Sequence, residues 1–170
     1  MHRRQFLASS ALGLAALRLS RFAYAGDAAS TPLALPEALK NNPLLDFSGL
    51  PKFSAFTPAD VAPAIDFLIN HNREQVEKIA AIAAPDWDNF FVPLSDAADK
   101  LNRAWGIVVH LNNVKNSDAL REAHDAALAK ITDYSSWLGQ HEALYQGFVK
   151  LKEAAAFAAY SPAQQKAITD

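Results

Sequence analysis

The stretch TPADVAPAIDFLINHNREQVEKIA, residues 57–80, carries the pattern that decides the fold. Thr57 is a favourable N-cap, because its hydroxyl accepts from a free backbone N–H, and Pro58 suits the first helical position, where an N–H would have no partner. Asp60 adds negative charge at the positive end of the helix dipole. The apolar residues that follow recur at helical spacing; they are Val61, Ile65, Leu68, Val76 and Ile79. The stretch therefore predicts a long amphipathic helix that ends before Pro85.

Three more helical segments follow the first. A second helix is predicted over residues 87–112 with Asp88 as its cap, a third over residues 117–138 with Ser117 as its cap, and a fourth over residues 140–159. Their buried stripes are expected at Leu94, Ala97, Ala98, Leu101, Trp105 and Val108, at Leu120, Ala123, Ala127, Ile131 and Tyr134, and at Leu144, Phe148 and Leu151. No alternating strand pattern and no internal repeat occurs. The sequence therefore predicts an all-α antiparallel helical bundle.

Composition narrows the possible classes of partner and site. The chain has 170 residues, no cysteine, 51% apolar residues and a formal net charge of −2. Without cysteine it has neither disulfides nor thiolate metal ligands, so any metal would need histidine and carboxylate ligands. No basic block occurs, which gives a nucleic-acid partner no support. We read the apolar stripes as helix-to-helix packing; a membrane-surface or cofactor role is the less favoured alternative.

The N-terminal stretch MHRRQFLASSALGLAALRLSRFAYAGDA, residues 1–28, has the three parts of an export signal. Its apolar run, residues 8–17, is shorter than the ~20 residues of a membrane span. Paired arginines before x-Phe-Leu are typical of twin-arginine signals. The signal residues are Arg3, Arg4, Phe6 and Leu7, and the cleavage-site residues are Ala23 and Ala25. We expect residues 1–25 to direct export to the periplasm, leaving no stable membrane span; the alternatives are an amphipathic first helix or a misplaced start codon.

Two further segments border the helices. Residues 26–51 are predicted to be a linker or extended segment, and residues 52–170 the helical region. The apolar residues expected to pin the extended segment onto the domain are Leu44, Leu45, Phe47, Leu50, Phe53 and Phe56. The last stretch, residues 160–170, begins a short helix capped by Ser161 that gains little by folding. We expect the chain to be truncated within this helix; the alternative is a frayed natural terminus.

The histidines give no metal site. His141 and Glu142 are followed by Tyr145, where the zinc-peptidase pattern H-E-x-x-H has a second histidine. We expect His141 to cap or bond near the turn at Gly139 and Tyr145 to pack. His71 and His124 read as surface residues, whereas His110 reads as partly buried. No G-x-S-x-G, phosphate-binding glycine loop or catalytic cysteine occurs, so the sequence predicts no catalytic, cofactor-binding or metal-ligating residue in this chain.

Longer segments carry a resemblance to a known family. They are NPLLDFSGLPKFSAFTPADVAPAI (42–65), WDNFFVPLSDAADKLNRAWGIVVHLNNVKNSDALREAHDAAL (87–128) and YSSWLGQHEALYQGFVKLKE (134–153). Together they resemble the N-terminal region of the oligopeptidase A and thimet oligopeptidase family of zinc metallopeptidases. HLNNVKNS and GQHEALY are the most specific matches.

The resemblance implies a fold, and it implies separate roles for the N-terminal helices and the zinc-binding region. Family members consist of two helical lobes that flank a deep cleft with one zinc at its floor, and the N-terminal helices form part of one wall that limits substrates to short peptides. The zinc-binding H-E-x-x-H helix lies beyond the matching region, so no catalytic residue carries over and no zinc is expected in this chain. Relatives are usually cytoplasmic, so the export signal is a departure.

Two hypotheses follow from the resemblance. In the first, the chain is the N-terminal helical part of a zinc metallopeptidase that hydrolyses short peptides, and its partner is the missing catalytic domain. In the second, it is a stand-alone exported helical binding module without catalytic activity.

Overall fold

The predicted first helix, α1, spans Pro58–Ala80. All five of its predicted stripe residues are buried, none more than 4% exposed, as helical spacing requires. The cap at Thr57 differs in detail from the prediction: its hydroxyl donates to the Asp60 carboxylate (2.8 Å), and its backbone N–H donates to the same oxygen (2.7 Å). Asp60, three residues into the helix, therefore fixes the first turn of α1.

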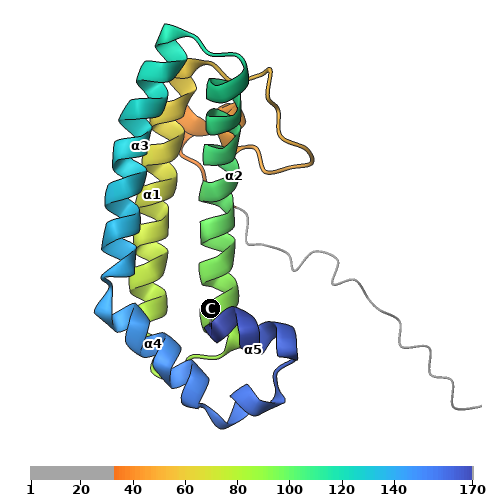
Figure 1. Cartoon of the computed structure of the whole chain (residues 1–170), viewed down its shortest axis with the longest axis vertical. Coiled ribbons are helices and arrows are strands. Elements are labelled where there is room, and N and C mark those ends of the chain that lie inside the picture. Colours follow the sequence, from red (N-terminus) through yellow and green to blue (C-terminus); the bar gives the residue numbers. More distant parts are fainter. Residues whose placement is uncertain (1–32, 170) are drawn as a thin grey trace, which may run out of the picture. The chain divides into compact units, whose positions relative to one another are not determined.

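The computed structural model describes residues 33–169, which all lie in one compact unit, Ala34–Asp170, apart from the first of them. Helix α2 spans Val92–Val114 and α3 spans Asp118–Gly139. Figure 1 shows α1, α2 and α3 running side by side, each antiparallel to the one before it in sequence. Within residues 33–169 there is no β-strand. The predicted all-α fold is confirmed, and so is the cap at Ser117, whose hydroxyl accepts from the Leu120 N–H (3.2 Å).

The start of α2 differs from the prediction. A single π-helical turn, Trp87–Phe91, precedes it, and the cap is Asp86, two residues before the predicted Asp88. The Asp86 carboxylate accepts from the Asn89 N–H (2.7 Å) while the Asn89 side chain accepts from the Asp86 N–H (2.8 Å). Pro93 has no N–H to donate, so a regular α-helical ladder cannot run through it unbroken. The wide turn accommodates that break.

Helix α1 lies at the centre of the bundle and packs against α2, α3 and α4. Asn72 of α1 is fully buried and donates to the Ala97 carbonyl of α2 (3.0 Å). Lys130 of α3 pairs with Asp66 of α1 (2.6 Å) at the surface. Buried residues contributed by α2 and α3 are Ala97, Leu101, Ala104, Ile107, Val108, Leu120, Ala127 and Tyr134. Each fully buried large apolar side chain contributes about 1.5–3 kcal/mol, so this core holds the three helices together.

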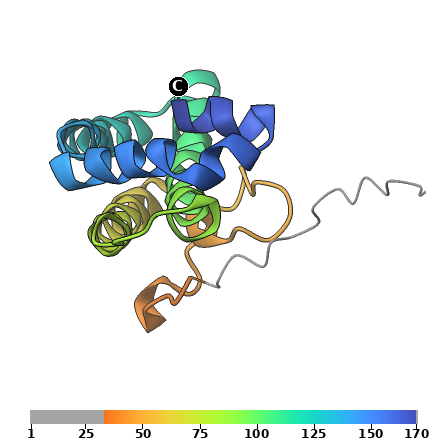
Figure 2. The same cartoon turned by 90° about the horizontal axis from the view of Figure 1, so that it is seen from below.

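Two shorter helices cross the end of the bundle where α1 ends and α2 begins, as Figure 2 shows from below. They are α4, Glu142–Glu153, and α5, Pro162–Thr169, joined by a 3₁₀ turn, Ala155–Ala159. The buried cluster beneath them, named here the lower core, consists of Val76, Ile79, Phe90, Leu144, Leu151 and Ile168. The expectation that the last helix gains little by folding is wrong, because Ile168 is 8% exposed within this cluster.

A close contact fixes how α4 meets the π-helical turn. A Cβ added at Gly147 of α4 would lie 2.3 Å from Cε2 of Phe90, whose side chain is fully buried. Carbon atoms attract best at about 3.5–4.0 Å, so only glycine allows the Phe90 ring to approach this closely. Phe148 meets the same ring edge-on (5.0 Å between centroids).

Residues 34–56, named here the strap, lie before α1. The strap contains two 3₁₀ turns, Glu37–Leu39 and Pro43–Leu45. Leu44 and Leu45 are 1% and 4% exposed, as predicted. The prediction is wrong for Leu50, which is 86% exposed, and for Phe53, at 41%.

Candidate functional site

The strap borders a hollow, named here the strap pocket. This strap pocket has a volume of about 470 Å³. Its lining residues are Leu35, Lys40, Asn41, Asn42, Pro43, Leu45, Asp46, Phe47, Lys52 and Ala55. The buried Asn42 holds the strap to the helices, because its side chain donates to the Asp60 carbonyl of α1 (2.9 Å) and accepts from the Leu44 N–H (3.0 Å).

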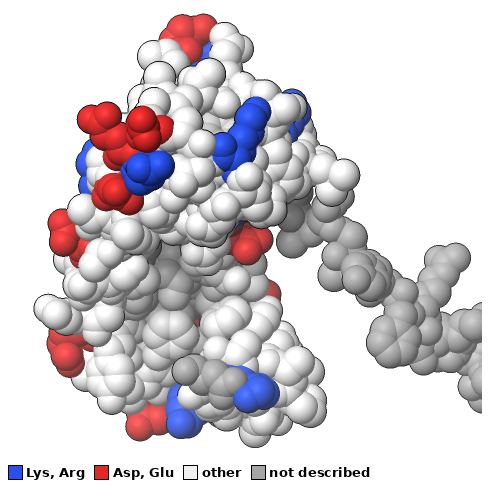
Figure 3. All heavy atoms as spheres, turned by 45° about the horizontal axis from the view of Figure 1, so that its top comes forward, with Lys and Arg blue, Asp and Glu red and all other residues white. Residues whose placement is uncertain are grey.

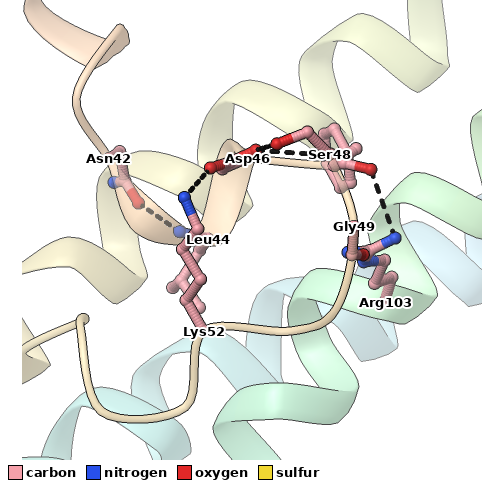
Figure 4. A network of polar contacts seen from close by, with 8 residues as sticks. Asn42, Leu44, Asp46, Ser48, Gly49, Lys52 and Arg103 are labelled. Atoms are coloured by element: carbon pink, nitrogen blue, oxygen red, sulfur yellow. Dashed lines mark hydrogen bonds and ion pairs between the residues drawn. The ribbon is translucent and has the colours of Figure 1, made fainter.

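Polar side chains beside the pocket contact one another and the strap backbone (Figure 4). The Asp46 carboxylate accepts from the Lys52 ammonium, the Ser48 hydroxyl (2.5 Å) and the Ser48 N–H (3.0 Å). The bond from Lys52 and those from Ser48 hold the pKa of Asp46 well below its usual range. Arg103 of α2 donates to the carbonyls of Phe47 (3.3 Å) and Gly49 (2.5 Å). These charges therefore organise the strap and leave no paired nucleophile and base.

Arg103 is the residue here that sequence patterns missed. Its two carbonyl partners lie 54 and 56 residues earlier, and its guanidinium also lies 5.9 Å from the centroid of the Phe47 ring. Gly49 has a φ of +65°, in the left-handed region that glycine adopts without strain. The only local signal was the turn at Ser48–Gly49, which does not identify a partner on α2.

The second hollow is an apolar groove where the strap meets the α2–α3 turn. The groove has a volume of about 220 Å³. Its lining residues are Phe53, Ser54, Phe56, Pro58, Leu111, Lys115, Ser117 and Leu120. The Phe53 ring lies 5.1 Å from the ring of His110. The groove has the size and polarity to hold one or two apolar side chains, and it offers no catalytic group.

Four histidines lie among the described residues, and each has a packing or capping contact. His141 is the N-cap of α4, which confirms the prediction, whereas Tyr145 is 62% exposed, so the expectation that it packs is wrong. His124 stacks on Trp105 (4.9 Å) with 14% of its side chain exposed and is more covered than predicted. His110 is exposed, against prediction. Burial, and then the charge of Lys100, lower the pKa of His71.

Residues 33–169 contain no group of three or more histidine and carboxylate side chains placed to hold a metal ion. Helices in that range are too short or too polar to cross a membrane. On the face drawn in Figure 3, acidic and basic side chains lie near one another and form no broad field of one sign. The predicted signal and cleavage residues, Arg3, Arg4, Phe6, Leu7, Ala23 and Ala25, lie outside the described residues.

The sequence matches known proteins over most of the described residues. The family model of the neurolysin/thimet oligopeptidase N-terminal domain matches residues 65–170. Oligopeptidase A of Haemophilus influenzae is 47% identical over 128 residues, and Oligopeptidase A of Escherichia coli is 43% identical over 128 residues. An organellar oligopeptidase A of Arabidopsis thaliana, described as chloroplastic/mitochondrial, is 29% identical over 132 residues.

These matches cover 75% of this chain for the two bacterial relatives and 78% for the plant relative, but only 19%, 19% and 17% of the relatives themselves. The chain thus spans about a fifth of the length of the curated relatives it matches. The family match extends over more than half of the chain and takes in α2 to α5 and most of α1. The chain therefore belongs to the neurolysin/thimet oligopeptidase N-terminal domain family.

Proposed function

We propose that this chain is the N-terminal helical part of an oligopeptidase A-like zinc metallopeptidase that hydrolyses short peptides. The observation that carries the proposal is the 43–47% identity to two proteins named Oligopeptidase A, over 128 residues. In this proposal the bundle forms part of one wall of a substrate cleft and limits access to short, flexible peptides. The bond-breaking chemistry belongs to sequence outside residues 33–169.

The described residues do not fit a zinc site. His141, the histidine of the HEALY stretch, uses Nδ1 to accept the Leu144 N–H (3.1 Å), and its Nε2 faces the Glu77 carboxylate (3.3 Å). Tyr145, at the position of the missing second histidine, is exposed. No step of peptide hydrolysis is therefore assigned to these side chains, and the proposal gives this chain a structural role in substrate access.

A chimera tests the proposal. The matching 128 residues of Escherichia coli Oligopeptidase A would be replaced by those of this chain, and hydrolysis of a quenched short peptide would be compared with the parent enzyme. We expect activity within about tenfold of the parent, because a wall misplaced by 1 Å would cost about 10²-fold. A folded, zinc-loaded chimera without activity would contradict the proposal. A second chimera carrying Gly147→Leu, which drives a large side chain into Phe90, serves as the disrupted control.

We also propose that residues 1–25 direct export through the twin-arginine route, so that the peptidase acts on peptides in the periplasm. The support is the sequence pattern alone. Residues 1–33 fused to a reporter should deliver it to the periplasm, and replacing both Arg3 and Arg4 by lysine should stop delivery. Equal export of the two fusions would refute a twin-arginine signal.

The apolar groove favours one second candidate, an exported helical binding module. About 220 Å³ of hollow lined by Phe53 and Phe56 suits an apolar side chain of a partner. The chimera separates the two functions, because a module that evolved away from peptidase architecture would not restore peptide hydrolysis.

A further inference from the structure

We propose that His141 is a protonation-sensitive joint, which caps α4 only while its imidazole is neutral. This inference concerns the fold itself and goes beyond the proposed peptidase function. It starts from two contacts made by one ring. Nδ1 accepts from the Leu144 N–H (3.1 Å), and Nε2 lies 3.3 Å from Oε1 of Glu77 on α1.

The two contacts define one tautomer. An Nδ1 that accepts a hydrogen bond carries no proton, so the proton of the neutral ring is on Nε2, where it is donated to Glu77. The side chain of His141 is only 10% exposed, and its ring packs edge-on against Trp137 of α3 (5.1 Å). One imidazole therefore joins α1, α3 and the first turn of α4 in a fixed orientation.

Protonation removes the acceptor. The imidazolium carries N–H groups on both nitrogens, so Nδ1 and the Leu144 N–H become two donors facing each other. The ring charge then lies at the N-terminus of α4, the positive end of the helix dipole. Arg73 of α1, whose guanidinium lies 4.4 Å from the Trp137 ring centroid, adds a second positive charge next to the ring against which His141 packs.

The remaining charged and titratable neighbours do not restore the cap. Glu77 attracts the imidazolium from α1, but its side chain is 65% exposed, so the attraction is screened by water. Glu142 contributes negative charge from the first turn of α4. Tyr134 of α3 stays neutral, because burial raises its pKa. None of these groups offers an acceptor to the Leu144 N–H in the structure.

Loss of the His141 cap also affects the packing of the lower core. Helix α4 contributes Leu144 and Leu151 to that cluster, and its first turn contains Leu144. Loss of the cap frees the first turn of α4, so acid loosens the crossing of α4 over α1 before the three-helix bundle itself unfolds.

Hydrogen exchange on the full chain tests the joint, with an internal control. The Ser117 hydroxyl caps α3 by accepting from the Leu120 N–H (3.2 Å), and Leu120 is the third residue of α3 as Leu144 is the third residue of α4. Serine does not change its charge in acid, so this cap serves as the control. Between neutral pH and an acidic pH at which the ¹⁵N shifts of the ring show His141 protonated, we expect the protection factor of the Leu144 amide to fall about fivefold to tenfold. The protection factor of Leu120 should stay constant. A constant value for Leu144, or equal falls for both amides, overturns the proposal.

His141→Asn provides the matched variant. Asparagine accepts at an N-cap as well as any residue and does not titrate, so Leu144 protection should be equal at both pH values. An undiminished fall in this variant overturns the proposal. If the variant fails to fold, the ¹⁵N shifts of the wild-type ring decide: a proton on Nδ1 at neutral pH refutes the joint, and a proton on Nε2 supports it.

Discussion

The contact between Gly147 and Phe90 gives the sharpest stability prediction, because a matched control lies in the same protein. Gly147→Ala places a Cβ 2.3 Å from Cε2 and 2.5 Å from Cζ of Phe90, which is fully buried. In Gly106→Ala, the new Cβ on α2 meets nothing within 4 Å. Both positions are helical, so both variants gain the same intrinsic helix preference.

The magnitudes follow from these two environments. Replacing glycine by alanine within a helix gains about 1 kcal/mol, so Gly106→Ala should be more stable than the wild type by up to that amount. Gly147→Ala gains the same term, but overpacking costs about 1–3 kcal/mol or more when the neighbour must move by over 1 Å. We expect a gap of about 2–3 kcal/mol between the two variants. At about 2–4 °C per kcal/mol for a chain of this size, Tm should differ by about 5–10 °C.

Thermal and urea unfolding of the full chain, followed by circular dichroism, measures this gap. Phe90→Leu in the Gly147→Ala background is the rescue variant, because a smaller side chain at position 90 removes the ring edge and should lower the cost of the alanine. Equal stability of the two alanine variants, or a cost at position 147 that the rescue variant leaves unchanged, would show that α4 does not approach the π-helical turn this closely.

Three further predictions concern the strap, the partly buried His71 and a surface ion pair. Leu44→Ala should lower the free energy of unfolding by about 2–5 kcal/mol, because Leu44 is 1% exposed. Leu50→Ala in the same segment should change it by less than about 0.5 kcal/mol, because Leu50 is 86% exposed. Urea denaturation of both variants measures the two changes, and equal losses would contradict the packing of the strap. Burial lowers the pKa of His71 in the folded protein below its usual 6.5. The stability that the neutral ring provides is therefore complete above pH 6.5 and is lost as the pH falls through the lower pKa of the folded state. An NMR titration should give a pKa below 6.5, and His71→Gln should reduce the loss of stability in acid. Lys130→Met should lower the free energy of unfolding by at most about 1 kcal/mol, because the ion pair of Lys130 with Asp66 is about half exposed. This loss should become smaller in high salt, which screens the pair. A loss of several kcal/mol that does not depend on salt would be inconsistent with a surface ion pair.

Local patterns were enough to predict most of the helices, although the fourth, predicted over residues 140–159, ends at Glu153 and is followed by a 3₁₀ turn. Thr57, Ser117 and His141 each lie at a helix start where the sequence places them, because a cap depends on three or four consecutive residues. Every residue predicted for the buried stripe of α1 is buried, because apolar residues at helical spacing share one face. The prediction did not include Ala64, Ile69 and Asn72, which are buried as well.

Contacts between distant segments were beyond sequence reasoning. Asp86 replaces the predicted Asp88 as a cap because its partner is Asn89 and because Pro93 breaks the ladder, a competition that composition does not rank. Arg103 reads as one more charged residue on a helix, and only the folded strap brings the Gly49 carbonyl to it. Tyr145 was expected to pack, but the packing face of α4 is set by the position of Phe90.

For the candidate site, too, local features were predicted from the sequence and contacts between distant segments were not. The sequence argued against a zinc site at His141, because no second histidine follows at the required spacing, and it predicted that His141 would cap or bond near the turn at Gly139. It did not indicate the strap pocket or the apolar groove, since both are formed by residues whose proximity depends on how the strap folds over α1 and α2.

The most direct test of the account is peptide hydrolysis by the 170-residue chain on its own, measured with one equivalent of zinc and a quenched short peptide. Under the proposed function this helical unit limits substrate access and does not carry the chemistry, so neither stoichiometric zinc binding nor turnover is expected. Tight binding of one zinc together with turnover that a chelator abolishes would contradict it.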